Sequence, residues 1–249
     1  MISEKEFAVG FAGFWSECLP FLTPQVVAEF NVIGTALTEG RREWVKPLAG
    51  SGDNSNNDVV AETAFGLFAA SLKEGKDVLT LARDMAMIKA IGDSAIERIL
   101  GLRGYWMAKR RQIDSPTDEA IELAKRLEDY FSAQPSEQLI VVQPQFKGCG
   151  ILNSCYGDLH AAKCLYELKM VERNLRSADL RQVLIYCALN YRSQQYNIES
   201  VVVLNPRRGI EFRFAVEELA ARAARKTSGE LFHEITEFLC NFETAHQAS

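Results

Sequence analysis

The most constraining feature of this chain is a pair of apolar runs that carry charged residues and are separated by a short polar break. Asp158 closes the first run, the break spans residues 160–163, and Glu167 and Lys169 stand inside the second run. Two such runs with a short connection predict a β-hairpin. In an antiparallel pair of such strands, we expect Asp158 at the end of one strand to lie close to Glu167 on the other.

Strand geometry predicts that Glu167 and Lys169 lie side by side. Side chains alternate across a strand, so residues two positions apart share a face. Leu165 continues this face farther along the strand, whereas Tyr166 and Leu168 point to the opposite side. A carboxylate and an ammonium are therefore expected next to each other on an otherwise apolar strand.

Two carboxylates and an ammonium suit a divalent cation that activates water. Asp158 and Glu167 offer the oxygen ligands that Mg²⁺ or Mn²⁺ prefers, and a metal-bound water is acidified and can attack a phosphodiester. The ammonium of Lys169 can orient that water and offset negative charge in the transition state. The alternative interpretation of the Glu-x-Lys is a solvated strand face with a weak charge pair.

A helix is predicted over residues 177–190, with Ser177 or Asp179 as its cap. Gln182 and Tyr186 are four positions apart, so they share one face of this helix. Gly157-Asp158, then Glu-x-Lys, then Gln-x-x-x-Tyr, in this order, resemble the motifs of the PD-(D/E)xK nuclease superfamily, in particular its RecB-type branch. The resemblance covers about residues 117–213.

The resemblance implies a set of site residues. Asp158 and Glu167 would bind Mg²⁺ or Mn²⁺ together with the peptide carbonyl of Leu168. Lys169 would assist the attacking water. The remaining motif residues, Gln182 and Tyr186, would line the site and steady the substrate phosphate or the lysine.

Two departures from the family pattern stand out. Gly157 occupies the position of the usual proline, and the first acid, which many relatives place on the helix before the sheet, is missing. Glu128 borders the apolar stripe of the preceding helix and is a candidate for that acid. The competing interpretation makes Glu128 a surface residue of a charged helix.

The predicted elements favour an α/β (α+β) fold in which helices flank a mixed sheet. The order is a helix, three strands, a helix and a strand, which is the restriction-endonuclease-like core that the resemblance implies. The expected bounds are 117–131 for the first helix, 138–142, 151–156 and 164–171 for the strands, 177–190 for the second helix and 198–204 for the last strand.

Two domains are expected. Residues 1–112 form an N-terminal helical region for docking, dimerisation or covering the substrate, and residues 113–249 form the nuclease-like domain. The predicted helices of the first region cover 7–14, 24–37, 59–72, 77–90 and 94–109, with a polar loop at 50–58, and two further helices at 216–225 and 229–242 follow the core.

Cationic residues near the predicted site suggest contact with nucleic acid. Arg173, Arg176 and Arg181 flank the start of the helix that carries Gln182, and a helix N-terminus with arginines nearby suits phosphate. Residues 105–111 interleave aromatic and basic groups, as in a strand-contacting patch. Either group can instead be solvated or part of the core.

Composition limits the function classes. The net charge of −5 excludes a general polyanion-coating protein. The sequence contains no apolar run of about 18 or more residues, so we expect no membrane span. Acidic residues near its start argue against a signal peptide, and we therefore expect a cytoplasmic protein. The six cysteines form no Cys-x-x-Cys pair, which favours buried free thiols over a metal cluster.

The leading hypothesis is a Mg²⁺-dependent deoxyribonuclease. The resemblance implies a role in prokaryotic antiviral defence, restriction or recombination, with DNA as the partner and a homodimer as the expected assembly. The alternative is a non-catalytic nucleic-acid-binding or assembly subunit of an ATPase or helicase complex. A third interpretation is an α/β protein in which the Glu-x-Lys is accidental.

Overall fold

The computed structural model describes residues 1–32, 41–48, 57–103, 118–134 and 139–247. The patch predicted at 105–111 lies outside the described residues, as does most of the polar loop predicted at 50–58. None of the described helices is both long and apolar enough to cross a membrane.

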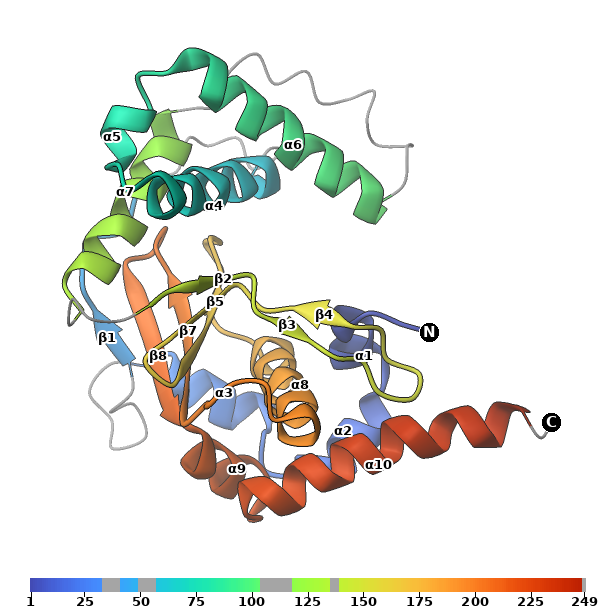
Figure 1. Cartoon of the computed structure of the whole chain (residues 1–249). Coiled ribbons are helices and arrows are strands. Elements are labelled where there is room, and N and C mark those ends of the chain that lie inside the picture. Colours follow the sequence, from blue (N-terminus) through green and yellow to red (C-terminus); the bar gives the residue numbers. More distant parts are fainter. Residues whose placement is uncertain (33–40, 49–56, 104–117, 135–138, 248–249) are drawn as a thin grey trace.

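A mixed sheet lies at the centre of the described structure, which confirms the α/β class (Figure 1). Its one parallel pair is β6–β7, and all other neighbouring strands are antiparallel. The six strands follow the order β1 (Arg41–Glu43), β8 (Ile210–Ala215), β7 (Ser200–Asn205), β6 (Cys164–Leu168), β5 (Leu159–Ala161) and β2 (Val141–Val142). A separate two-stranded ribbon is formed by β3 (Gln145–Phe146) and β4 (Cys155–Tyr156).

Helices cover both faces of the sheet, so the chain has three layers (Figure 1). One face carries α1 (Glu4–Gly10), α2 (Ala12–Cys18), α3 (Pro24–Phe30), α8 (Ser177–Ser193), α9 (Val216–Ala224) and α10 (Ser228–Gln247). The other face carries α4 (Asn57–Glu74), α5 (Val78–Leu81), α6 (Met85–Arg103) and α7 (Asp118–Ser132). Helix α8 connects the two parallel strands, which need such a crossover.

The side chains of the central strands alternate between two apolar cores. Leu165 and Val201 pack with the cluster under α8, whereas Tyr166 and Val202 pack with the cluster under α4 and α7. Because both faces of β6 and β7 are buried, these strands are apolar on both sides. A charged residue on this part of the sheet is consequently unusual.

The predicted hairpin is present, with a shorter turn than expected. Strands β5 and β6 pair antiparallel, with Ala161 opposite Cys164. Ala162 and Lys163 have φ of 47° and 64°, the left-handed geometry that two-residue hairpin turns require. Strand β5 begins after Asp158, whereas we expected the first hairpin strand to end there, so the expected position of that strand was wrong and its antiparallel direction was right. Asp158 nevertheless comes next in register after the Leu159–Tyr166 pair, which places it across from Glu167.

The first 48 residues contribute to the sheet and its helices. Strand β1 pairs with β8, and the N–H of Trp44 donates to the carbonyl of Gly209 at 2.9 Å. Ile2 forms a bridge with Leu152 beside β4. Helices α4, α5 and α6 take no part in the contacts of residues 1–48 just described. The domain boundary predicted at residue 112 lies outside the described residues and stays a prediction.

Several predicted bounds were wrong for identifiable reasons. The helices expected at 77–90 and 94–109 are a single turn, α5, and one continuous helix, α6. Residue 94, where a new helix was expected to begin, lies inside α6, and the preceding Asp93 accepts from Lys89 at 2.7 Å within the same helix. The strand expected at 151–156 is reduced to β4, and β1, β3, β5 and β8 were not predicted.

Candidate active site

Four of the predicted site residues form one line of hydrogen bonds between β6 and α8. Lys169 Nζ donates to Glu167 Oε1 at 2.8 Å and to Gln182 Oε1 at 2.8 Å. Gln182 Nε2 in turn donates to Tyr186 Oη at 2.8 Å. Glu167 and Gln182 are each 4% exposed. The structure therefore brings the Glu-x-Lys strand and the Gln-x-x-x-Tyr helix face together, as the motifs predict.

Asp158 joins this cluster from the neighbouring strand. Its Oδ2 accepts from the backbone N–H of Leu168 at 2.6 Å. Burial and the charge of Glu167 raise the pKa of Asp158 well above its usual range, although the Leu168 hydrogen bond and Lys169 oppose that shift. Two acids, the buried Glu167 and the half-buried Asp158, thus share a site that contains one ammonium, which leaves the pair short of positive charge.

Lys169 stays a cation in this environment. Burial alone would lower its pKa, but the charges of Glu167, Asp179 and Asp158 outweigh burial, and the pKa of Lys169 is raised. The side chain can therefore act as an ammonium that donates hydrogen bonds. It is not suited to act as a neutral general base.

Asp179 belongs to the site, although the motifs do not include it. It is 4% exposed and binds Arg173 in bidentate fashion at 2.6 and 2.8 Å. Its Oδ1 lies 3.8 Å from Lys169 Nζ. Burial would raise the pKa of Asp179, but the hydrogen bonds from Arg173, the charge of Lys169 and the N–H of Arg176 lower it overall. The only sequence signal was its position as a candidate helix cap.

The three arginines predicted to contact nucleic acid have different surroundings. Arg173 is held by the carboxylate of Asp179. Arg181 donates to the carbonyl of Ala8 at 3.2 Å and lies over the ring of Trp15 at 5.6 Å, on the side of α8 that faces α1 and α2. Arg176 is exposed immediately before α8. Nucleic-acid contact by these arginines stays a prediction.

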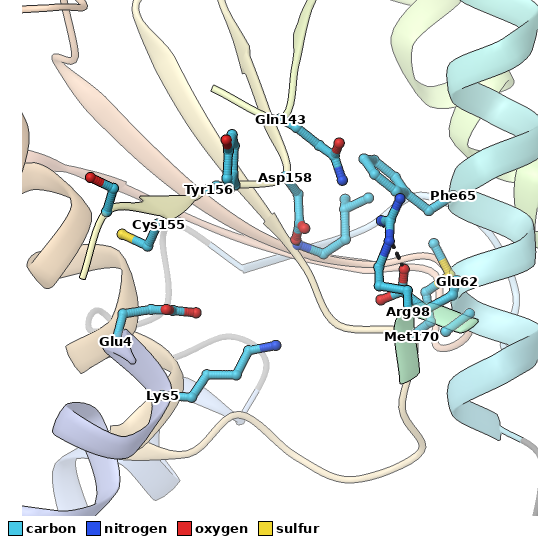
Figure 2. A pocket seen from close by; sticks show the side chains of 14 residues that line it. Glu4, Lys5, Glu62, Phe65, Arg98, Gln143, Cys155, Tyr156, Asp158 and Met170 are labelled. Atoms are coloured by element: carbon cyan, nitrogen blue, oxygen red, sulfur yellow. Dashed lines mark hydrogen bonds and ion pairs between the residues drawn. The ribbon is translucent and has the colours of Figure 1, made fainter. Parts of the chain in front are cut away.

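A cleft of about 490 Å³ opens beside Asp158 (Figure 2). Asp158 and Leu168 form part of its wall, and Glu167 and Lys169 adjoin these two residues without being among the lining residues themselves. Figure 2 shows α1 contributing side chains on one side and α4 and α6 on the other. Sequence analysis did not identify the charged and aromatic lining residues Glu4, Lys5, Glu62, Phe65, Arg98 and Tyr156.

The charges of the cleft come from elements distant in the sequence. Arg98 of α6 and Glu62 of α4 form an ion pair at 3.2 Å across their helices. Lys5 of α1 is exposed, and its charge acts on Asp158. No residue in the described part of the chain pairs with the ammonium of Lys5. Lys5 is thus a cation available to a ligand that enters the cleft.

Within the described residues, no three His, Cys, Asp or Glu side chains gather as a metal-binding cluster. Glu128 does not supply a third acid at the predicted site, because its Oε1 accepts from the N–H of Val78 at 2.8 Å and its Oε2 pairs with Lys125. A site built on Asp158 and Glu167 would therefore rely on two carboxylates, a peptide carbonyl and water. Mg²⁺ accepts such a set, since it usually keeps several waters.

Comparisons with known proteins found no matching family model, no matching curated protein and no matching solved structure.

Proposed function

We propose that this chain is a divalent-metal-dependent nuclease that hydrolyses phosphodiester bonds of DNA. One observation carries the proposal: the hydrogen-bonded line from Glu167 through Lys169 and Gln182 to Tyr186 adjoins Asp158 at the wall of a cleft. A buried line of this kind is costly to assemble for stability alone. We infer a role in prokaryotic defence, restriction or recombination.

The order of elements supports a restriction-endonuclease-like core. Helix α7 is followed by strands β2, β5 and β6, then by helix α8 and strand β7. The succession again has a helix, three strands, a helix and a strand, but its second strand is β5, and the stretch expected at 151–156 forms β4 of the ribbon that is inserted after β2. Glu167 belongs to β6, which lies between β7 and β5 in the sheet, and Lys169 directly follows that strand.

Asp158, Glu167 and the carbonyl of Leu168 would hold Mg²⁺ or Mn²⁺. The raised pKa of Asp158, which comes from burial and from Glu167, fits this assignment, because a cation would supply the missing positive charge. Asp158 Oδ1 and Glu167 Oε2 accept from none of the described residues, so each acid keeps an oxygen for a ligand. When bound, the metal would acidify a water and offset charge on the phosphate.

Lys169 is the group that we propose to contact the reacting phosphate or water. An ammonium has three N–H donors, and two of them are directed at Glu167 and Gln182. The third can donate to an anionic oxygen and stabilise negative charge that develops there. Gln182 acts as a positioning residue, because it is fixed by Tyr186 and in turn fixes the lysine.

The cleft is suited to a DNA strand that approaches Asp158. Lys5 supplies a cation on one side, Arg98, which pairs with Glu62, lies on the other, and Tyr156, which is 56% exposed, offers an aromatic face. Phosphate contacts and base stacking are the usual means of holding single strands. Against the overall charge of −5, binding would depend on these local groups.

Cleavage assays with matched lysine variants test the proposal. Linear, circular and single-stranded DNA would be incubated with Mg²⁺, with Mn²⁺ and with EDTA. Lys169→Met should abolish cleavage, whereas Lys163→Met, in the hairpin turn that precedes β6, should retain it. Lys163 is a suitable control because its ion pair with Glu199 lies on the surface, where both side chains are more than half exposed. Circular dichroism would show that both variants fold.

The outcomes separate the candidate functions. Metal-dependent cleavage that survives Lys169→Met would refute the proposed mechanism. DNA binding without cleavage, in every metal tested, would favour the alternative of a non-catalytic nucleic-acid-binding subunit.

A further inference from the structure

Two thiols from distant parts of the chain meet beneath an arginine, away from the cleft. Cys149 follows β3 and Cys240 lies in α10, and their Sγ atoms are 3.3 Å apart. Arg192, in the last turn of α8, donates to Cys240 Sγ at 2.8 Å and to Cys149 Sγ at 3.4 Å. The guanidinium is thus directed at both sulfur atoms.

The backbone fixes this pair. Gly150 has φ of 55°, and a Cβ at this position would come within 2.0 Å of the carbonyl oxygen of Leu239. The N–H of Ile151 donates to that same carbonyl at 3.2 Å. Cys149 Sγ also donates to the carbonyl of Thr236 at 3.7 Å. The turn therefore packs directly on α10, and the two sulfur atoms are held in contact by main-chain interactions on either side.

The two thiols have complementary properties. Cys240 is partly exposed and receives the shorter hydrogen bond from Arg192, so its sulfur is the one that an oxidant can reach and that the guanidinium contacts most closely. Cys149 is 6% exposed, so solvent reaches it poorly. A disulfide has an S–S length of about 2.05 Å. The Sγ atoms, now 3.3 Å apart, would therefore have to approach each other by about 1 Å to form the bond.

We propose that Cys149 and Cys240 form a reversible dithiol–disulfide site that is oxidised by peroxides. The thiolate of Cys240 attacks one peroxide oxygen and becomes a sulfenic acid, while the O–O bond breaks and the other oxygen leaves as water after protonation. The thiol of Cys149 then attacks the sulfenic sulfur, and the second oxygen leaves as water. Two electrons and two protons pass from the thiols to the peroxide, and an S–S bond forms.

The other cysteines provide internal controls. Cys18, Cys155, Cys164 and Cys187 are all buried. Within the described residues, which include all six cysteines, no other pair of sulfur atoms is in hydrogen-bond contact. Specific oxidation should therefore consume two thiols and leave four, which distinguishes this site from general oxidative damage.

The experiment treats the folded full-length chain with a small excess of hydrogen peroxide. Thiols would be counted in denaturant, and non-reducing peptide mapping by mass spectrometry would identify linked peptides. We expect a loss of two thiols, a single link between the peptides that contain Cys149 and Cys240, and full recovery with dithiothreitol. The oxidised protein should also unfold at a higher temperature, because the link closes a long loop.

Variants keep the result interpretable. Cys240→Ser and Cys149→Ser should each abolish the link. Arg192→Gln should slow its formation several-fold, whereas Arg192→Lys, which retains the charge, should slow it less. Six free thiols after treatment, a link between other cysteines, or an oxidation rate unchanged in Arg192→Gln would overturn the proposal. None of these readouts depends on nuclease activity.

Discussion

The buried ion pair of the site should respond very differently to removal of its lysine and to removal of its glutamate. Lys169→Met removes the ammonium that, within the described part of the chain, contacts Glu167, and Glu167 is 4% exposed. Breaking a buried pair by deleting one partner costs about 3–5 kcal/mol. We expect the free energy of unfolding of Lys169→Met to fall by about that amount.

Glu167→Gln should cost less. Lys169 keeps its hydrogen bond to Gln182 and stays 3.8 Å from Asp179, and the substitution removes the carboxylate that raises the pKa of Asp158. We expect a loss of about 1–3 kcal/mol, the cost of weakening a buried hydrogen bond. The loss in free energy of unfolding of the double variant should be smaller than the sum of the two single losses by at least about 0.5 kcal/mol, because the two residues interact directly.

Urea unfolding followed by circular dichroism, at pH 7 and with EDTA present, measures these differences. Lys163→Met is the matched control and should leave the unfolding midpoint unchanged. If Lys169→Met unfolds within about 1 kcal/mol of the parent, or if the two substitutions add without coupling, the ion pair is not buried as described.

Four further results are expected. Asp179→Asn should lower the stability measured by urea unfolding at pH 6, and this gap should shrink as the pH falls below about 4, because a lowered folded-state pKa contributes stability only above the unfolded value. Cys18, whose pKa burial raises to about 12, should resist iodoacetamide at pH 8 until the chain unfolds. Gly209→Ala should lower the melting temperature, since φ is 65° and a Cβ would lie 1.9 Å from the carbonyl oxygen of Val45. Lys5→Ala should weaken single-stranded DNA binding several-fold in a fluorescence anisotropy titration without metal, and unchanged affinity would exclude Lys5 as a phosphate contact.

Local periodicity was sufficient to predict the centre of the site. Residues two apart on a strand and four apart on a helix share a face, and the structure brings Glu167, Lys169, Gln182 and Tyr186 together on that basis. The hairpin was predictable because its two strands are adjacent in the sequence. The mixed α/β class followed from the alternation of strand-like and helix-like runs.

Features that depend on distant partners could not be predicted in this way. Asp179 looked like a helix cap, and its proximity to Lys169 emerges only when α8 packs beside β6. The position of Lys5 at the cleft depends on α1 packing against α8. Strand β8 did carry a readable signal, since Ile210, Phe212 and Phe214 alternate with polar residues, but β1 is too short to be recognised without the partner that it pairs with.

Direct measurement of Mn²⁺ binding tests the central claim, namely that Asp158 and Glu167 form a cation site. Electron paramagnetic resonance at pH 7 would report free and bound Mn²⁺ for the parent, for Asp158→Asn and for Glu62→Gln, an acid of the same cleft that pairs with Arg98. We predict saturable binding that is lost in Asp158→Asn and retained in Glu62→Gln. Binding that is absent from the parent, or unaffected by Asp158→Asn, would contradict the assignment.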